Sequence, residues 1–188
     1  MIVRIVSIVV CLFGLLCGSF CQADESGTQE YKAQELTLQV PKAWKEKPTA
    51  NKLRLAQFEI PAMEGDSEPA ELAVFPPFGG SVAENIKRWV GQFESEGMKA
   101  TFTQGKVAQG AYVLADISGT YQKPDGPPIA RKTKPAPNYR MIAVILSTEK
   151  KGNYFLKLTG PEKTVAAAAD ALRKSFGANA AQEEKFEF

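Results

Sequence analysis

The chain has 188 residues, with 23 Lys and Arg against 21 Asp and Glu, which suits one soluble domain and gives no general attraction to nucleic acid or to an anionic membrane. It contains no histidine, and its three cysteines all lie within the first 21 residues. These absences exclude Ser-His-Asp and Cys-His catalysis, metal sites built on imidazole, and thiolate chemistry in the rest of the chain.

The N-terminal segment has the pattern of an export signal. One positive charge, at Arg4, precedes an apolar run from Ile5 to Phe20, which is short for a membrane span of about 20 residues. Small residues at Cys21 and Ala23 favour cleavage after residue 23. We therefore expect a secretory signal peptide over residues 1–23 and a periplasmic or extracellular protein. Retention as an uncleaved anchor and lipidation of a cysteine remain open.

The next part of the chain predicts a leader and three strands. The polar stretch 24–34 is expected to be a flexible leader. Alternating apolar residues, closed by prolines or turns, predict the strands that follow. They are Leu36–Val40, Leu53–Ile60 and Glu71–Phe75.

A helix is predicted from Val82 to Glu96. Ser81 and Glu84 form a capping box at its start, and Gly97 is placed to end it. Apolar residues recur at helical spacing, so one face is expected to be buried. These residues are Val82, Ile86, Trp89, Val90 and Phe93.

Four strands and a second helix follow. The strands are Met98–Phe102, Val113–Tyr121, Met141–Leu146 and Tyr154–Leu158. Pro161 occupies the favoured first position of the last helix, and Gly177 ends it. Residues 178–188 are expected to form a loose C-terminal tail.

This order of elements predicts an α+β fold. Short turns between neighbouring strands favour antiparallel pairing, and each helix with an apolar face must cover a face of the sheet. We therefore expect one domain over residues 35–177. Its single antiparallel sheet has about six or seven strands and is covered by two helices, in the order β-β-β-α-β-β-β-β-α.

Several segments resemble exported proteins of planctomycete-type bacteria whose function is uncharacterised. The segments are Phe58–Ala62, Glu71–Phe75, Gly79–Gly80, Asn85–Phe93, Gly119–Tyr121 and Lys157–Pro161. The order of elements is also similar to the PsbP-like fold, shared by a photosystem II extrinsic subunit and a Ran-binding transport factor. Both are binding proteins, so the resemblance implies binding rather than catalysis. It implies no particular partner, because a fold does not fix a function.

A basic, proline-rich loop from Gln122 to Tyr139 is the first candidate for partner binding. Connections of this length are uncommon inside compact domains. Its cations are Lys123, Arg131, Lys132 and Lys134, with Arg140 just beyond. We interpret the loop as a semi-rigid arm for an anionic surface, with a solvated insertion as the alternative. The aromatic interleaving typical of nucleic-acid binding is missing.

The second candidate is a polar stripe on the predicted helix. Asn85, Arg88 and Gln92 recur at i, i+3 and i+7, so they lie beside its apolar face. The functional interpretation is a ligand contact through this stripe. The structural alternative is a solvated helix face on which Arg88 pairs with Glu84.

Two further patterns do not predict a functional site. Acidic residues gather at Glu64, Asp66, Glu68 and Glu71. Their spacing does not match an EF-hand loop, so no metal site is predicted. The segment Ser147–Lys150 matches S-x-x-K, but the companion S-D-N and K-T-G motifs of penicillin-binding enzymes do not accompany it.

The sequence thus predicts an exported, non-catalytic binding or accessory domain of the cell envelope, with no cofactor. Its partner is expected to be a protein or an anionic envelope component and not a nucleic acid, with membrane contact only through an uncleaved N-terminal segment. The alternative is a small hydrolase-type enzyme that uses only Asp, Glu, Lys or Ser. A buried carboxylate with a raised pKa in a deep pocket favours the enzyme, whereas a flat apolar patch or a basic patch around Lys132 favours binding.

Overall fold

The computed structural model describes residues 27–126, 132–148 and 152–188. The predicted signal peptide over residues 1–23 lies outside these ranges. Within them, no helix has both the length and the apolar content needed to cross a membrane.

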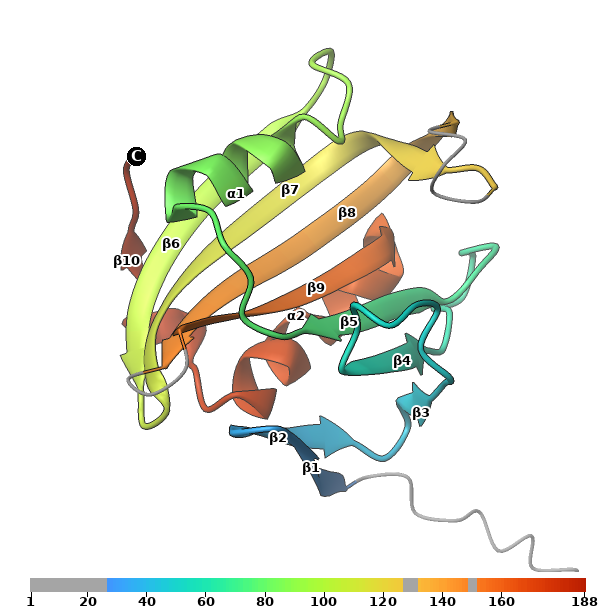
Figure 1. The fold of residues 1–188 in the computed structure, drawn as a ribbon. Helices are drawn as coiled ribbons and strands as arrows, with labels where there is room; N and C mark the ends of the chain where they lie inside the picture. The colour runs from blue at the N-terminus through green and yellow to red at the C-terminus, as the bar shows by residue number, and fades with distance from the viewer. Residues whose placement is uncertain (1–26, 127–131, 149–151) are drawn as a thin grey trace, which may run out of the picture.

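The described residues form two sheets, two α-helices and a short 3-10 helix (Figure 1). The strands are β1 (Thr28–Ala33), β2 (Leu36–Pro41), β3 (Lys45–Glu46), β4 (Ala56–Ile60), β5 (Ala70–Phe75), β6 (Lys99–Val107), β7 (Gly110–Pro124), β8 (Thr133–Thr148), β9 (Gly152–Pro161) and β10 (Glu184–Lys185). The helices are α1 (Val82–Val90), α2 (Glu162–Ser175) and the 3-10 helix η2 (Ala180–Gln182).

The main sheet has eight strands in the order β10-β6-β7-β8-β9-β5-β4-β3, and every pairing in it is antiparallel. β1 and β2 pair in a separate two-stranded sheet. The predicted α+β class is confirmed, but the expected six or seven strands are too few. The expected single sheet is also wrong, because the predicted strand Leu36–Val40 lies in β2, which pairs with β1 outside the main sheet. The strands that the sequence missed in the main sheet, β3 and β10, have two residues each and lie at its edges, where no apolar alternation marks them.

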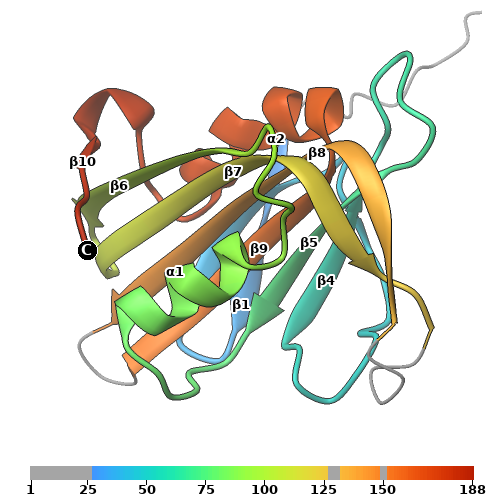
Figure 2. The same ribbon diagram turned by 90° about the horizontal axis from the view of Figure 1, so that it is seen from above.

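The two helices lie on opposite faces of the main sheet (Figure 2). α2 packs against one face and against β2, with Val165 and Leu172 fully buried between them. α1 covers part of the other face, where Ile86 and Trp89 pack against β7, β8 and β9. A helix is about 10 Å wide and strands are about 4.8 Å apart, so one helix covers two or three strands. The same face therefore continues past α1 over β5 and β4.

α1 is shorter than the predicted helix to Glu96. Its capping box at Ser81 is present, but the helix ends at Val90. The reason is a competing interaction, since Phe93 forms a β-bridge with Tyr121 and residues 92–94 bond to β7 through their backbones. The chain after α1 is thereby fixed beside the sheet.

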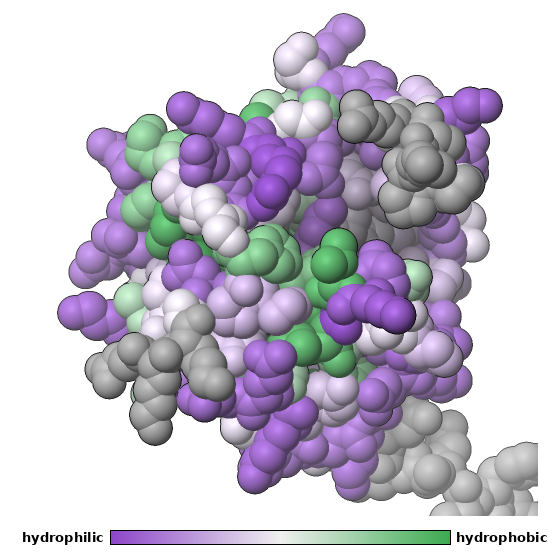
Figure 3. All heavy atoms as spheres, in the orientation of Figure 1, coloured by the Kyte–Doolittle hydropathy of each residue, from purple (hydrophilic) through white to green (hydrophobic). Residues whose placement is uncertain are grey.

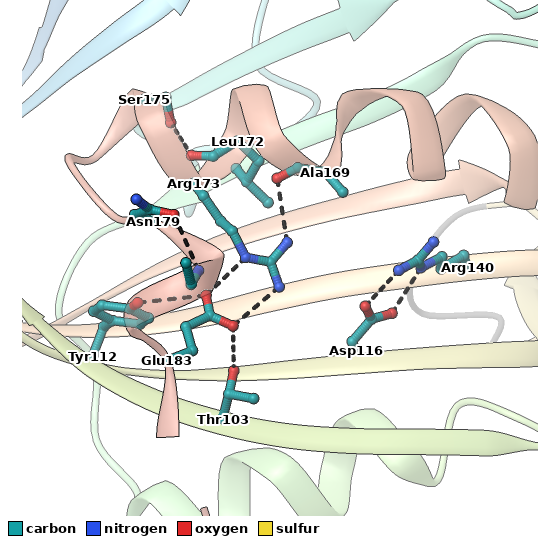
Figure 4. A network of polar contacts seen from close by, with 11 residues as sticks. Thr103, Tyr112, Asp116, Arg140, Ala169, Leu172, Arg173, Ser175, Asn179 and Glu183 are labelled. Atoms are coloured by element: carbon teal, nitrogen blue, oxygen red, sulfur yellow. Dashed lines mark hydrogen bonds and ion pairs between the residues drawn. The ribbon is translucent and has the colours of Figure 1, made fainter. Parts of the chain in front are cut away.

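Both ends of the described chain are more ordered than the sequence suggested. Residues 28–33, in the expected leader, form β1. At the other end, β10 pairs with β6, and the Glu183 carboxylate is only 5% exposed. It accepts hydrogen bonds from Arg173 Nε at 2.7 Å and from Thr103 Oγ1 at 2.8 Å (Figure 4). Residues 178–188 are therefore held against the sheet instead of forming a loose tail.

Most of the predicted basic loop 122–139 is a β-ribbon. β7 and β8 continue to pair across its described residues, from Tyr121 opposite Ala136 to Pro124 opposite Thr133. β8 tolerates Pro135 and Pro137 because β9 pairs with it only from Tyr139 onward, which leaves one edge of β8 free beyond that point. The ribbon carries its side chains toward the uncovered part of the α1 face.

Candidate functional site

A pocket of about 430 Å³ opens on the α1 face of the main sheet, beside α1. Its floor comes from β9, β5 and β4, and its walls come from the β7–β8 ribbon and the segment after α1. We call it the polar pocket. Its polar side chains are Lys47, Arg54, Gln57, Glu59, Glu68, Glu71, Gln92, Tyr121, Lys123, Tyr139, Lys157 and Thr159.

Strand alternation explains how a lysine reaches this position in a central strand. In β9, Tyr154, Leu156 and Leu158 belong to the core on the α2 face. Because successive side chains point to opposite faces, Lys157 and Thr159 point to the α1 face and line the pocket. β9 lies between β8 and β5, so the lysine stands well inside the sheet.

Lys157 is desolvated, and its hydrogen-bond partners among the described residues are neutral. Its Nζ donates to Gln92 Oε1 at 2.7 Å and to the Tyr121 hydroxyl at 3.4 Å. It forms no ion pair with any carboxylate in the described part of the chain. Burial, followed by the nearby positive charge of Arg54, lowers the pKa of Lys157 to about 8, although Glu71 opposes the shift. Burial raises the pKa of Tyr121 to about 12, so its hydroxyl stays neutral.

A network of three side chains occupies the β4–β5 side of the pocket. Arg54 Nη1 donates to Glu71 Oε1 at 2.7 Å, and Gln57 Nε2 donates to Glu71 Oε2 at 2.7 Å. Both oxygens of Glu71 therefore have donors. The Nε atom of Arg54 is buried and has no partner among the described residues.

A second network lies on the ribbon side. Glu68 accepts hydrogen bonds from Lys123 Nζ and from the Tyr139 hydroxyl. These two hydrogen bonds, that of Lys123 first, lower the pKa of Glu68. The Tyr139 ring stacks on Tyr121 with ring centres 5.7 Å apart. This network ties the ribbon to the segment before β5.

The charges of the pocket do not balance. Three carboxylates that line it are each paired with a cation: Lys47 with Glu59, Arg54 with Glu71, and Lys123 with Glu68. Among the described residues that line the pocket, Lys157 is then the cation without a carboxylate partner. In addition, the Oγ1 atom of Thr159 is buried without a partner among the described residues, as is Arg54 Nε. The described side chains of the pocket thus carry one positive charge more than they carry negative charges.

An apolar groove of about 490 Å³ adjoins the polar pocket and shares Phe75 and Lys157 with it. We define the apolar groove by its hydrophobic side chains, Leu53, Phe75, Phe78, Trp89 and Phe155. Leu53 is 69% exposed and Phe78 is 42% exposed, although Phe78 stacks on Phe155. Figure 3 shows hydrophobic atoms gathered at the centre of this face, between α1 and β5, with hydrophilic side chains around them.

The structure places three residues of the two predicted candidates at this site. Lys123 and Gln92 line the polar pocket, and Arg88 lines the apolar groove. Asn85 is buried, and its amide donates to the backbone oxygen of Ser81 at 2.9 Å while its side-chain oxygen accepts from Arg88. Asn85 therefore holds the start of α1 and orients Arg88.

The other predicted cations lie elsewhere. Arg140 forms a two-pronged ion pair with Asp116, at 2.7 and 2.6 Å, on the α2 face of the sheet (Figure 4). Lys132 and Lys134 are exposed near the ribbon tip. Arg131 lies outside the described residues. The structure therefore divides the predicted basic arm between two faces.

The acidic cluster is divided as well. Asp66 accepts hydrogen bonds from the backbone nitrogen and hydroxyl of Thr164, at 2.9 and 2.6 Å, and so caps α2. Glu68 and Glu71 belong to the separate networks of the pocket. No group of acidic, histidine or cysteine side chains suited to a metal ion occurs in residues 27–126, 132–148 and 152–188. In the S-x-x-K segment, Ser147 donates to Asn153 Oδ1 at 2.7 Å, while residues 149 and 150 lie outside the described ranges.

The sequence interpretation missed Lys157, Arg54 and Thr159. A single lysine between leucines in an apolar strand was the available signal, because such a residue must face a polar feature or leave the sheet. No pattern in the sequence indicated that Lys157 would have no carboxylate partner among the described residues. That property depends on side chains brought together from several elements.

No protein-family model and no curated protein matches the chain. Eight chains of solved structures are similar to it, among them the following two. A Pseudomonas aeruginosa protein of unknown function, described as a candidate regulator, has a TM-score of 0.43 and 16% identity, over 79% of this chain and 92% of that one. Cyanobacterial PsbP from Synechocystis has a TM-score of 0.49 and 10% identity, over 90% of this chain and 99% of that one.

The expected PsbP-like resemblance thus has a counterpart among solved structures. The expected relation to planctomycete-type proteins stays a prediction. At these TM-scores, neither similar structure carries an argument about function.

Proposed function

We propose that the chain is an exported, non-catalytic binding domain of the cell envelope that holds a small amphipathic anion in the polar pocket and the apolar groove. The observation that carries the proposal is Lys157, a desolvated cation that faces the pocket and whose hydrogen-bond partners in the described part of the chain are neutral. The support for export is the signal-like pattern of residues 1–23.

An unpaired buried charge is costly, which makes its presence informative. Burying a charge without a counter-ion opposes folding, and proteins keep such groups mainly where a site requires them. Leucine or methionine in place of Lys157 fits the apolar character of β9 equally well. A ligand with a negative charge supplies the missing counter-ion.

The donors around the pocket suit an oxyanion. Lys157, Arg54 and Thr159 line the pocket with donor groups, and Arg54 Nε and Thr159 Oγ1 are buried without a partner among the described residues, whereas the lining carboxylates are already paired. A carboxylate or sulfonate has several acceptor sites on one small head group. Binding it to these donors satisfies groups that are otherwise buried without partners.

The apolar groove suits the rest of such a ligand. It opens directly beside Lys157, and both hollows have volumes within the range typical of ligand sites, about 300–1,000 Å³. Exposed apolar surface next to a buried polar head site matches an amphipathic molecule. A hydrocarbon arm that covers Leu53 and Phe78 gains about 25 cal/mol for each Å² of apolar area removed from water.

The described residues do not show the feature expected of the hydrolase alternative with a catalytic carboxylate. That alternative called for a buried carboxylate with a raised pKa, but hydrogen bonds from Lys123 and Tyr139 lower the pKa of Glu68. Glu71 is held on both oxygens. The described pocket carboxylates are thus arranged as structural partners of cations.

Calorimetric titration of the purified protein with decanoate tests the proposal. We expect saturable binding that weakens at least tenfold in Lys157→Met. Lys99→Met is the matched control, since Lys99 is exposed on β6 far along the sheet from the pocket, and its affinity should equal that of the unchanged protein. Equal affinity in Lys157→Met, or no saturable binding of decanoate or of the matching alkyl sulfonate, would overturn it.

A further inference from the structure

The side chain of Lys157 is shared by the polar pocket and the apolar groove, and its Nζ atom bonds to Gln92 and Tyr121 of the polar pocket. Lys157 lines both hollows. Its two hydrogen bonds go to Gln92 and Tyr121, which are neutral and therefore do not hold the proton of an ammonium group as a carboxylate does. An amine in this position is accessible from the pocket and has hydrocarbon on one side.

We propose that Lys157 captures hydrophobic aldehydes or ketones as an imine, with the carbonyl carbon at Nζ and the hydrocarbon arm in the apolar groove. The proposal uses the site of the proposed function but does not require that an anion binds there. It adds a second ligand class to the same pocket, held by a reversible covalent bond.

The reaction needs no group beyond the amine and the carbonyl compound. The lone pair of the neutral Lys157 amine attacks the carbonyl carbon, a C–N bond forms, and the carbonyl oxygen takes up a proton. The resulting carbinolamine then loses water, which carries away the former carbonyl oxygen and two hydrogens that were on the nitrogen. A C=N bond remains, nothing is oxidised or reduced, and hydrolysis reverses the sequence.

The surroundings of Lys157 favour both stages. Arg54 and Thr159 line the same pocket, and their Nε and Oγ1 atoms are buried without a partner among the described residues, so the site has donor side chains on the side where the oxygen becomes charged during attack. The apolar groove limits water beside the imine, which opposes its hydrolysis. Arg54 Nε and Thr159 Oγ1 form no hydrogen bond to another described side chain.

The amine is also available in its reactive form. With a pKa of about 8, roughly a tenth of Lys157 is uncharged at pH 7. An ordinary lysine, with its pKa near 10.5, is uncharged in only about one molecule in 3,000. The difference predicts roughly a 100-fold faster reaction after allowance for the lower nucleophilicity of a weaker base.

Lys123 provides a comparison inside the same pocket. It is paired with Glu68, and the net effect of its surroundings raises the pKa of Lys123. Access to the pocket alone would allow both lysines to react. The proposal requires that Lys157 reacts and Lys123 does not.

Reductive trapping tests this inference. The purified protein is incubated with hexanal and sodium cyanoborohydride at pH 7, and the modified peptides are identified by mass spectrometry over time. We expect an adduct at Lys157 about 100-fold faster than at Lys123 or at the exposed Lys99, with a rate that rises with pH and levels off above about 8. Lys157→Met should lose the fast adduct, and Leu53→Asp should remove the preference for hexanal over acetaldehyde.

Equal rates at the three lysines, or a fast adduct that survives in Lys157→Met, would overturn the inference. Circular dichroism is used to check that each variant is folded, so that loss of the adduct can be assigned to loss of the reactive amine and not to unfolding. If decanoate binds and no selective adduct forms, the imine proposal fails alone. If neither ligand engages the pocket, the proposed function fails with it.

Discussion

Lys157 and Lys123 line the same pocket, yet their pKa values are shifted in opposite directions. Lys123 pairs with Glu68, and although burial alone lowers its pKa, the hydrogen bonds to Glu68 and Tyr139 give a net rise. Lys157 donates to Gln92 at 2.7 Å, and burial lowers its pKa to about 8. One lysine is thus a structural partner of a carboxylate, and the other remains available to a ligand.

Replacing Lys157 with methionine is expected to stabilise the protein. The pKa of Lys157 falls from 10.5 to about 8 on folding, so the charged amine opposes folding below pH 8 and the penalty disappears as the pH rises toward 10.5. After allowance for access from the pocket and for two lost hydrogen bonds, Lys157→Met should raise the free energy of unfolding at pH 7 by about 1–2 kcal/mol.

Urea denaturation of both proteins measures this effect. The difference between Lys157→Met and the unchanged protein should shrink between pH 8 and pH 10, because the unfolded chain binds a proton there that the folded chain does not. A variant that is less stable at pH 7 contradicts the interpretation of Lys157 as a binding group and indicates a structural one.

Glu68→Gln is expected to convert Lys123 into a second reactive amine. Burial is the largest influence on the pKa of Lys123 and lowers it, while Glu68 and Tyr139 raise it; the substitution removes the contribution of Glu68 and leaves those of burial and Tyr139. Hexanal trapping at pH 7 should then modify Lys123 as well as Lys157. Glu59→Gln is the control, since Glu59 pairs with Lys47 instead, and it should leave Lys123 unmodified. Unchanged Lys123 in Glu68→Gln would show that the carboxylate does not control its reactivity.

The sequence predicted those elements whose signals are local. The capping box at Ser81 lies within four residues of the helix it starts, and Pro161 directly precedes α2, so both helix starts were found. The elements it missed depend on distant partners. β10 exists because β6 offers an edge, and the end of α1 is set by the bridge from Phe93 to Tyr121. No local pattern carries that information.

The candidate site was less predictable for the same reason. The partners of Lys157, Gln92 and Tyr121, are 65 and 36 residues away along the chain. Gln92 and Lys123 were selected from the sequence, but for an exposed surface and not for a pocket. The properties of each pocket cation depend on whether the fold brings a carboxylate to it. Alternation within a strand predicts only the face of the sheet on which each charged side chain lies.

Glu183→Ala is expected to destabilise the fold strongly. Glu183 is 5% exposed and Arg173 is 11% exposed, and removal of the carboxylate leaves a buried guanidinium without its partner. Breaking a buried pair in this way costs about 3–5 kcal/mol. Glu187→Ala is the control, because the pair of Lys185 and Glu187 is 80% and 78% exposed and should contribute less than about 1 kcal/mol. Chemical denaturation gives both values, and similar small losses would mean that the C-terminal segment is not held by Glu183.

Gly160→Ala tests whether the close approach of β9 and β5 at the pocket rim is required. A Cβ added to Gly160 would lie 2.5 Å from Ala70 Cβ and 2.7 Å from its Cα, so the two strands would have to separate. Overpacking of this kind costs about 1–3 kcal/mol, and the free energy of unfolding should fall by that amount.

Gly79→Ala is the matched control, since a Cβ there meets nothing within 4 Å. Gly160 lines the pocket, so decanoate affinity should fall in Gly160→Ala and stay constant in Gly79→Ala. Equal stability and affinity in the two variants would show that the rim adjusts without cost and that its spacing does not shape the site.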